Sequence, residues 1–164
     1  MTPSEYLVAS ARTAAGSTYP ERVCQDAFQA SIDDVIYEIE VLDRVKKGLF
    51  YNRDVNLDWP DEPSTSIFHD FDMDIVHGIL GVATEGSELL ELLRDPHRFE
   101  MEKLVDEAGD VCWYLAMLFR AADTSFEEVM AKNIAKLMVR FPEKFEEHLA
   151  NHRDDAKERA VFSA

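Results

Sequence analysis

Two acidic pairs with the same spacing are the residues of this sequence best suited to chemistry. Glu85 and Glu88 are three positions apart, and Glu107 and Asp110 repeat that spacing. Three residues turn an α-helix by about 300°, so each pair projects from one helix face. Four carboxylates that meet in a partly buried place repel one another unless cations neutralise them. Because Mg²⁺ and Mn²⁺ select oxygen ligands, the pairs predict a divalent-metal site if their helices are neighbours.

The residues around the acidic pairs are typical of a buried helix face. Apolar residues separate the acids, and Gly78 and Gly81 precede Glu85 on its own face. A glycine costs a helix about 1 kcal/mol relative to alanine, so two on one face predict the close approach of another backbone or of a ligand. Tyr114 follows Asp110 by one helical turn, where its ring can stack on a base or its hydroxyl can bind a phosphate.

Capping signals and helical spacing of apolar residues predict about five helices, and strand-type alternation persists nowhere. The predicted helices cover residues 3–15, 21–47, 68–93 and 99–122, and a last one begins after Thr124-Ser125 and is interrupted at Pro142. Gly48 is the predicted end of the second helix, and residues 49–66 are a predicted loop. A short connection at 95–98 requires the third and fourth helices to be antiparallel, which lets the acidic pairs converge.

The predicted fold class is therefore all-α, a helical bundle of about five helices whose two central antiparallel helices carry ExxE and ExxD. We expect a single domain over residues 1–164. Its parts are the N-terminal helices and loop (1–66), a catalytic core (67–145) and a polar C-terminal tail (146–164). A bundle this short is expected to complete its core by forming a homodimer or homotetramer.

Composition limits the partners of this chain. Its 164 residues include 17 Lys and Arg against 33 Asp and Glu, a net charge of −16. Such a chain repels nucleic-acid polymers, although a divalent metal can still join its carboxylates to the phosphates of a single nucleotide. We expect no membrane segment, because no apolar run approaches roughly 20 residues. Cys24 and Cys112 form no CxxC pair, which favours two reduced thiols in a cytoplasmic protein.

Several segments in order resemble the MazG-like nucleotide pyrophosphohydrolases of the all-α NTP pyrophosphatase superfamily. The segments are His77-Gly-Ile-Leu-Gly81, Thr84-Glu-Gly-Ser-Glu-Leu-Leu90, Asp106-Glu-Ala-Gly-Asp-Val-Cys-Trp-Tyr-Leu115, Lys132-Asn-Ile-Ala-Lys-Leu137 and Arg140-Phe-Pro142. The likeness covers roughly residues 70–145. It implies an enzyme that hydrolyses a nucleoside triphosphate to the monophosphate and pyrophosphate, by attack of water at the α-phosphorus, and that works as an oligomer.

The resemblance also implies roles for individual residues. The four acids Glu85, Glu88, Glu107 and Asp110 would be catalytic and hold Mg²⁺, for which Mn²⁺ can substitute. The predicted substrate-binding residues are Tyr114, Lys132, Asn133, Lys136, Arg140, Arg94 and His77. Of these, Lys132, Asn133, Lys136 and Arg140 are candidates for phosphate contact, and Arg94 occupies a place where many relatives have lysine. The preference for base and sugar is not indicated.

One motif departs from the family pattern. Relatives often have Lys-Lys and then Phe-Tyr-x-Arg after the ExxE helix, whereas here Lys46-Lys47-Gly-Leu-Phe50-Tyr51-Asn-Arg53 precedes Glu85. Either the N-terminal region contributes these groups through a rearranged topology, or the likeness is accidental. The sequence leaves both alternatives open.

Two other function classes are compatible with acidic helices. A non-catalytic interaction protein would use its acidic face to bind a basic partner and would not be stabilised by Mg²⁺. A di-iron carboxylate bundle requires Glu-x-x-His on each of two helices. The nearest segment here is Asp74-Ile-Val-His77, which does not meet that requirement, and iron analysis would test it.

Overall fold

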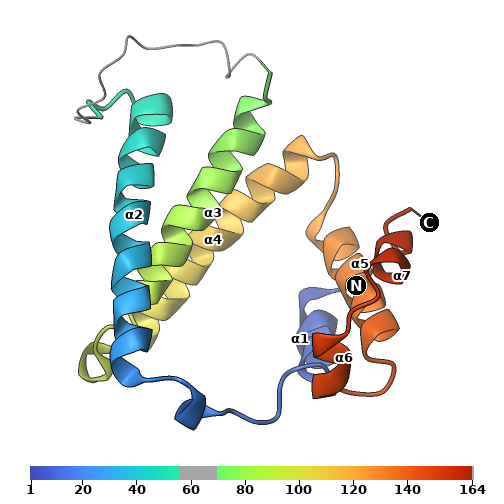
Figure 1. The fold of residues 1–164 in the computed structure, drawn as a ribbon. Coiled ribbons are helices and arrows are strands. Elements are labelled where there is room, and N and C mark those ends of the chain that lie inside the picture. Colours follow the sequence, from blue (N-terminus) through green and yellow to red (C-terminus); the bar gives the residue numbers. More distant parts are fainter. Residues whose placement is uncertain (56–69, 164) are drawn as a thin grey trace. The chain divides into compact units, whose positions relative to one another are not determined.

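Helices and the segments that join them make up the protein over the residues that its computed structural model describes, 1–55 and 70–163 (Figure 1). No strand occurs in these ranges, so the predicted all-α class is confirmed. The α-helices are α1 (Pro3–Ala11), α2 (Gln25–Tyr51), α3 (Met73–Glu91), α4 (Met101–Ala121), α5 (Phe126–Arg140), α6 (Glu147–Asn151) and α7 (Asp155–Ala160). Within the described residues, short 3₁₀-helices lie at Pro20–Arg22 and Pro96–Arg98. None of the helices in the described ranges combines the length and apolar character that crossing a bilayer requires.

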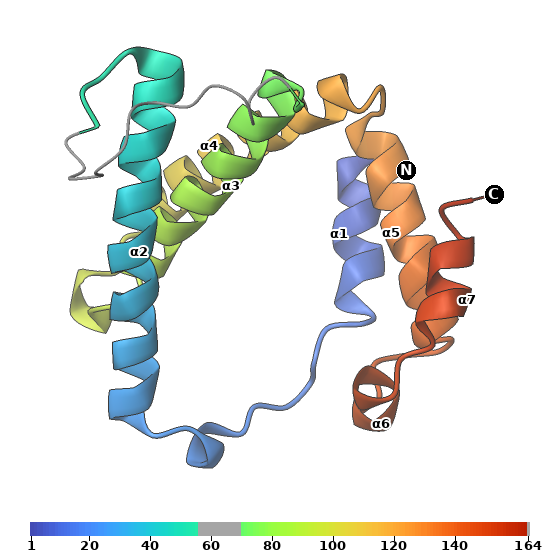
Figure 2. The same cartoon turned by 45° about the horizontal axis from the view of Figure 1, so that its top comes forward.

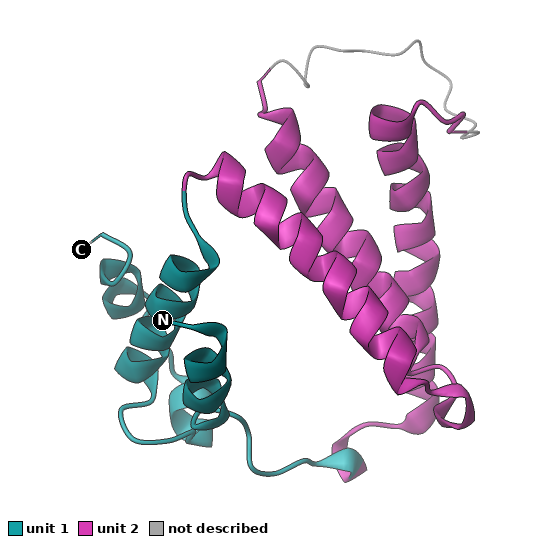
Figure 3. Ribbon diagram, turned by 180° about the vertical axis from the view of Figure 1, so that it is seen from behind, with its two compact units in different colours: residues 1–20, 124–164 teal, residues 21–123 magenta. Residues whose placement is uncertain are grey.

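The chain forms two compact units (Figure 3). Unit 1 consists of Met1–Pro20 and Thr124–Ala164, and in it α5 packs against α1 and α7. Unit 2 is Glu21–Asp123 and contains α2, α3 and α4. Both predicted acidic pairs lie in unit 2, so unit 2 positions the candidate site. The prediction that residues 1–164 form one domain stays a prediction.

Helices α3 and α4 lie side by side and are antiparallel (Figures 1 and 2). Gly78 of α3 faces Leu118 of α4, and Gly81 faces Tyr114, so positions rise along one helix as they fall along the other. A Cβ atom built on Gly81 would lie 2.1 Å from the Tyr114 ring. The two glycines therefore permit the close approach that their spacing predicts, and the approaching group is a neighbouring helix.

Helix α2 packs on α3, also antiparallel. Near one end Arg94, just after α3, pairs with Asp33 of α2. Near the other end Tyr51 of α2 contacts His77 of α3. Helix α3 thus contacts both of its neighbours, and its residues face α2 on one side and α4 on the other.

Local capping explains where several helices begin. At α1, Thr2 and Glu5 form the predicted reciprocal capping box. At α5, the Ser125 hydroxyl accepts a hydrogen bond from the Glu128 amide, as predicted. Helix α3 starts at Met73 because the Asp72 carboxylate caps its first amides. The start predicted at residue 68 lies outside the described residues.

The predicted end of the second helix at Gly48 is wrong. Helix α2 continues to Tyr51 and ends at Asn52, whose φ of 53° is the left-handed conformation that stops a helix. Contacts of the last α2 turn with α3 outweigh the modest cost of a glycine within a helix. Because Gly48 has no side chain, Val55 can lie against it. A Cβ atom built on Gly48 would lie 2.3 Å from Cγ2 of Val55.

The region predicted as a polar C-terminal tail contains two short helices, α6 and α7. Helix α7 is held to α5 by Glu158, a buried residue with 4% of its surface exposed. Its carboxylate accepts hydrogen bonds from the guanidinium group of Arg140, at 2.7 Å from Nε. A helix of this length gains its stability from such tertiary contacts rather than from its own hydrogen bonds.

Candidate functional site

The predicted acidic pairs meet between α3 and α4. One carboxylate oxygen from each of Glu85, Glu107 and Asp110 lies within 4.8 Å of the other two. Glu85 and Glu107 are buried, with 8% and 6% of their surface exposed, whereas Asp110 is exposed. The i, i+3 spacing and the antiparallel packing together place these side chains at the same level. We call Glu85, Glu107 and Asp110 the acid cluster.

Glu88, the fourth predicted acid, is more exposed and lies beside the acid cluster. Its pKa is raised to about 6, first by loss of solvent and then by the negative charges of Glu107 and Glu85. The negative charges of Glu107 and Glu85 thus add to the cost of ionising Glu88. A divalent cation with oxygen ligands would relieve this repulsion, so the donor set fits Mg²⁺ or Mn²⁺.

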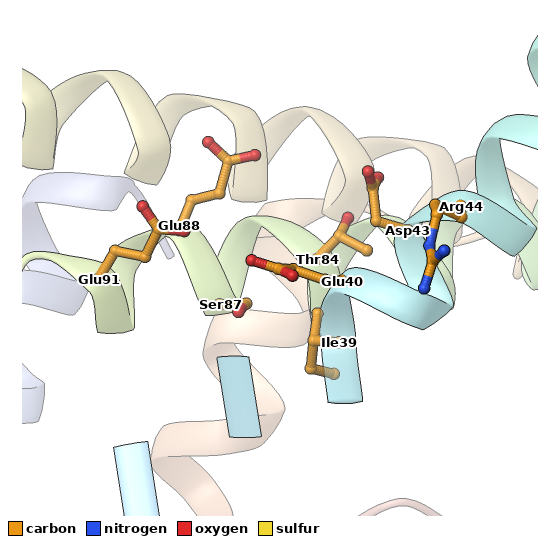
Figure 4. A pocket seen from close by; sticks show the side chains of 8 residues that line it. All are labelled: Ile39, Glu40, Asp43, Arg44, Thr84, Ser87, Glu88 and Glu91. Carbon is orange, nitrogen blue, oxygen red and sulfur yellow. The ribbon is translucent and has the colours of Figure 1, made fainter. Parts of the chain in front are cut away.

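A cavity of about 620 Å³ lies between α2 and α3 beside Glu88 (Figure 4). Its lining residues are Ile39, Glu40, Asp43, Arg44, Thr84, Ser87, Glu88 and Glu91. Four of these residues are acidic and one, Arg44, is basic. An anionic ligand can enter such a cavity only together with cations that offset this charge.

Lys46 of α2 is buried against the acid cluster, with 3% of its surface exposed. Its ammonium group donates to the Thr84 hydroxyl at 2.6 Å and to Oε1 of Glu85 at 3.2 Å. It also lies 3.2 Å from a carboxylate oxygen of Asp43. Lys46 is not among the predicted substrate-binding or metal-binding residues. The Lys-Lys…Phe-Tyr-x-Arg motif, which contains it, is the sequence feature that could have identified it.

The residues of the motif that precedes Glu85 fall into two groups, those that contact α3 and those that are exposed. Lys46, Phe50 and Tyr51 contact α3, which agrees with a contribution of the N-terminal region through a rearranged topology. Lys47 is 37% exposed in its side chain and pairs with Asp43, and Arg53 is exposed.

Aromatic rings surround His77 at the ends of α2 and α3. Phe50 stacks on the imidazole with ring centroids 3.9 Å apart, and Trp113 and Tyr114 meet it edge to face. The hydroxyl groups of Tyr51 and Tyr114 share a hydrogen bond of 3.0 Å. Desolvation and the positive charge of Lys46 lower the pKa of His77, which favours its neutral form.

Tyr114 joins the aromatic rings to the acid cluster. Its ring is buried, with 6% of the residue exposed, and the Lys46 ammonium lies 5.2 Å from the ring centroid. Burial and the hydrogen bond with Tyr51 raise the pKa of the Tyr114 hydroxyl. The predicted substrate-binding residues Tyr114 and His77 are therefore neighbours of the acid cluster, although most of the Tyr114 ring surface is covered by protein.

Four of the predicted basic and amide residues bind other residues of the protein. Arg94, in unit 2, lies 2.9 Å from Asp33. In unit 1, Lys132 lies 2.8 Å from Glu128, the Tyr6 hydroxyl donates to Asn133, and Glu158 binds Arg140. Lys136 lines a cavity of about 250 Å³ that Arg153 and Arg159 also line. Their proposed contact with phosphate stays a prediction.

Comparison with known proteins identifies the segment that contains this site. Residues 79–145 match the sequence model of the MazG nucleotide pyrophosphohydrolase domain. The match includes the acid cluster, Glu88 and all of α5. No curated protein and no solved structure matches the chain. The predicted resemblance to MazG-like proteins is therefore confirmed for residues 79–145, which form a MazG-like segment.

Proposed function

We propose that this protein is a divalent-metal-dependent nucleoside triphosphate pyrophosphohydrolase that releases a nucleoside monophosphate and pyrophosphate. The observation that supports this most directly is the acid cluster, three carboxylates within 4.8 Å in a segment that matches a MazG domain. The substrate is a ribo- or deoxynucleoside triphosphate. The proposed ion is Mg²⁺, with Mn²⁺ as a substitute.

Charge determines what each group of the site contributes. A triphosphate has about four negative charges, which the carboxylates beside the cavity would repel. A divalent cation held by Glu85, Glu107 and Asp110 would offset that charge, polarise the α-phosphate and activate a water molecule. Glu88 lies beside the cluster and is exposed, so its carboxylate is the best-placed group to accept the proton of the attacking water.

The proposed contacts with the rest of the substrate come from the family resemblance. Lys136 of α5 lines a cavity together with Arg153 and Arg159, whose positive charges are partly offset by Asp155 and Glu158 on the same lining. Arg140 is bound by Glu158, so it can contact phosphate only by sharing or exchanging that partner. We further propose that the protein is a cytoplasmic homo-oligomer.

The test of this function is a product analysis. Purified protein is incubated with a panel of ribo- and deoxynucleoside triphosphates, with Mg²⁺ or with EDTA, and the products are separated by chromatography. We expect monophosphate and pyrophosphate only with Mg²⁺. Diphosphate and phosphate would refute attack at the α-phosphorus, and a folded protein without any product would favour the acidic interaction protein.

A matched pair of variants tests the assignment of the site. Asp110→Asn removes one charge of the acid cluster and is expected to lower turnover at least about 100-fold, because the site loses a metal ligand. Asp106→Asn removes an exposed charge of the same helix outside the cluster and is expected to retain turnover. Circular dichroism should show the same helix content in both. Equal turnover of the two variants would show that the acid cluster is not the catalytic site.

A further inference from the structure

Lys46 is a buried cation placed among carboxylates. Its ammonium group lies 3.2 Å from Oε1 of Glu85 and 3.2 Å from Oδ1 of Asp43, and it donates to Thr84 at 2.6 Å. A buried ammonium group is tolerated only when it is paired and hydrogen-bonded, and these three groups meet that requirement. Glu85 belongs to the acid cluster, so Lys46 binds directly to a predicted metal ligand.

The surrounding packing holds Lys46 in this place. The Tyr114 ring covers its ammonium group at 5.2 Å, and Gly81 gives that ring the space to approach α3. The Thr84 hydroxyl is itself within hydrogen-bond distance of the Gly81 carbonyl oxygen. Lys47 provides a contrast, because it pairs with the same Asp43 but is 37% exposed in its side chain.

We propose that Lys46 is a positioning residue of the metal site and its built-in counter-ion. The inference rests on the proposed function, because it concerns the same acid cluster. Lys46 binds Oε1 of Glu85, which leaves the other oxygen of that carboxylate for a cation. Its positive charge stabilises the carboxylates when no metal is bound. The same charge repels a divalent cation, so Lys46 lowers the affinity of the site for metal.

If Lys46 is the counter-ion of the acid cluster, removing its charge should strengthen the binding of a divalent metal. Lys46→Met and Lys46→Gln both remove the charge, and Gln retains a hydrogen-bond donor. Calorimetric titration with Mn²⁺ should show that both variants bind the ion at least about tenfold more tightly than the wild type does. This is the effect expected from removing a unit positive charge near a divalent cation, even at the dielectric constant of water. Lys47→Met is the control and should change the affinity by less than about twofold.

A purely structural role of Lys46 gives the opposite result. Loss of packing would leave Mn²⁺ affinity unchanged or weaken it, and either outcome in both Lys46 variants would overturn the proposal. If wild-type protein binds no Mn²⁺, the proposed metal site fails. If the wild type binds Mn²⁺ and the Lys46 variants bind it no more tightly, only the counter-ion role fails.

A second measurement needs no metal. In EDTA, Lys46→Met should lower the midpoint of thermal unfolding by about 10 °C or more, because it leaves the buried carboxylate of Glu85 without its cation. Adding Glu85→Gln to this variant should restore much of the loss, since the unpaired charge is then gone. A loss that Glu85→Gln does not reduce would show that Lys46 acts by packing and would overturn the counter-ion role.

Discussion

Tyr114 shows how a single side chain links the packing of α3 and α4 to the candidate site. Its ring fills the space that Gly81 leaves free, covers the Lys46 ammonium group and contacts His77. The same ring is one turn from Asp110 of the acid cluster. Any movement of this ring would therefore disturb the lysine that binds Glu85.

Adding one methyl group at Gly81 tests this link. In Gly81→Ala the new Cβ would meet the Tyr114 ring at 2.1 Å, so the ring or the helix must shift. We expect a loss of about 1–3 kcal/mol in the free energy of unfolding of unit 2, the usual cost of overpacking. Urea unfolding followed by the fluorescence of Trp113, which contacts Tyr114, measures this loss.

Gly86→Ala is the matched control for that measurement. It is the same change in the same helix, but a Cβ at Gly86 would meet no other atom within 4 Å. It should stabilise the protein by about 0.5–1 kcal/mol, because alanine is the better helix former. Equal effects of the two substitutions would show that Tyr114 is not closely packed on Gly81.

The acid cluster could be predicted from sequence because its geometry is local. The i, i+3 spacing places Glu107 and Asp110 on one face of a helix, and a short connection makes α3 and α4 antiparallel. The position of Lys46 could not be predicted in this way. It binds Glu85 across 39 positions, and only the packing of α2 on α3 brings the two together.

At the scale of elements, α7 shows that a short helix of four charged residues and two alanines can dock on another helix. Its Glu158 has a carboxylate that accepts from Arg140 of α5 and lies 3.4 Å from Arg153. The hydrogen bond from Arg140 holds the pKa of Glu158 below its usual value. Because Glu158 is buried, this charged pair is expected to anchor α7.

Glu158→Gln tests whether the pair with Arg140 anchors α7. The stabilisation by this pair should depend on pH. The folded pKa lies below the unfolded value of about 4.3, so the stabilisation is complete above that value and is lost as the pH falls through the folded pKa. We expect the variant to lose about 1.5–3 kcal/mol of unfolding free energy near neutral pH. The difference from wild type should vanish in acid, as denaturant unfolding at a series of pH values would show.

The control for Glu158 is Glu143→Gln, which removes an exposed charge from the same unit. Its stability should follow that of the wild type at every pH within about 0.5 kcal/mol. If Glu158→Gln also follows the wild type, the pair with Arg140 does not hold α7. In that case the guanidinium group of Arg140 would be free to exchange its carboxylate partner for a phosphate.

The helices that the sequence predicts best are those with local start signals. Ser125 and Thr2 cap the helices that follow them, because a side-chain oxygen satisfies nearby amides whatever the rest of the chain does. Stop signals are weaker, and at Gly48 the contacts of Phe50 and Tyr51 with α3 extend the helix. Helix α7 also has a local start signal, because the Asp154 carboxylate accepts a hydrogen bond from the Lys157 amide, but its docking depends on Arg140 of α5.

At the scale of the whole molecule, the net charge of −16 opposes the binding of the proposed triphosphate substrate, which would therefore need a cation. Lys46 offsets part of the local charge, but Glu88 still has a raised pKa. The carboxylates of the proposed site would repel a free triphosphate, and a bound cation would offset that repulsion. Such a site would couple the binding of metal to the binding of nucleotide, because each offsets the charge that opposes the other.

The face of α4 opposite the acid cluster is relevant to the predicted assembly of the protein into an oligomer. Its acidic face packs on α3, whereas the opposite face shows an exposed apolar stripe at 4-3-4 spacing, formed by Met101, Val105, Ala108 and Cys112. Val105 alone is 66% exposed. Apolar residues at this spacing are typical of a helix that packs along another helix. The homo-oligomer stays a prediction, and we propose this stripe as the surface through which it forms.

Val105→Glu places a charge in the centre of this stripe and is expected to dissociate the oligomer, because a carboxylate would be buried without a partner. Light scattering coupled to gel filtration should give a dimer or tetramer for the wild type and a monomer, with the same circular dichroism, for the variant. Glu102→Gln changes an exposed residue of α4 outside the stripe and should leave the mass unchanged. A monomeric wild type would refute the oligomer, while an oligomeric Val105→Glu would place its interface on another surface.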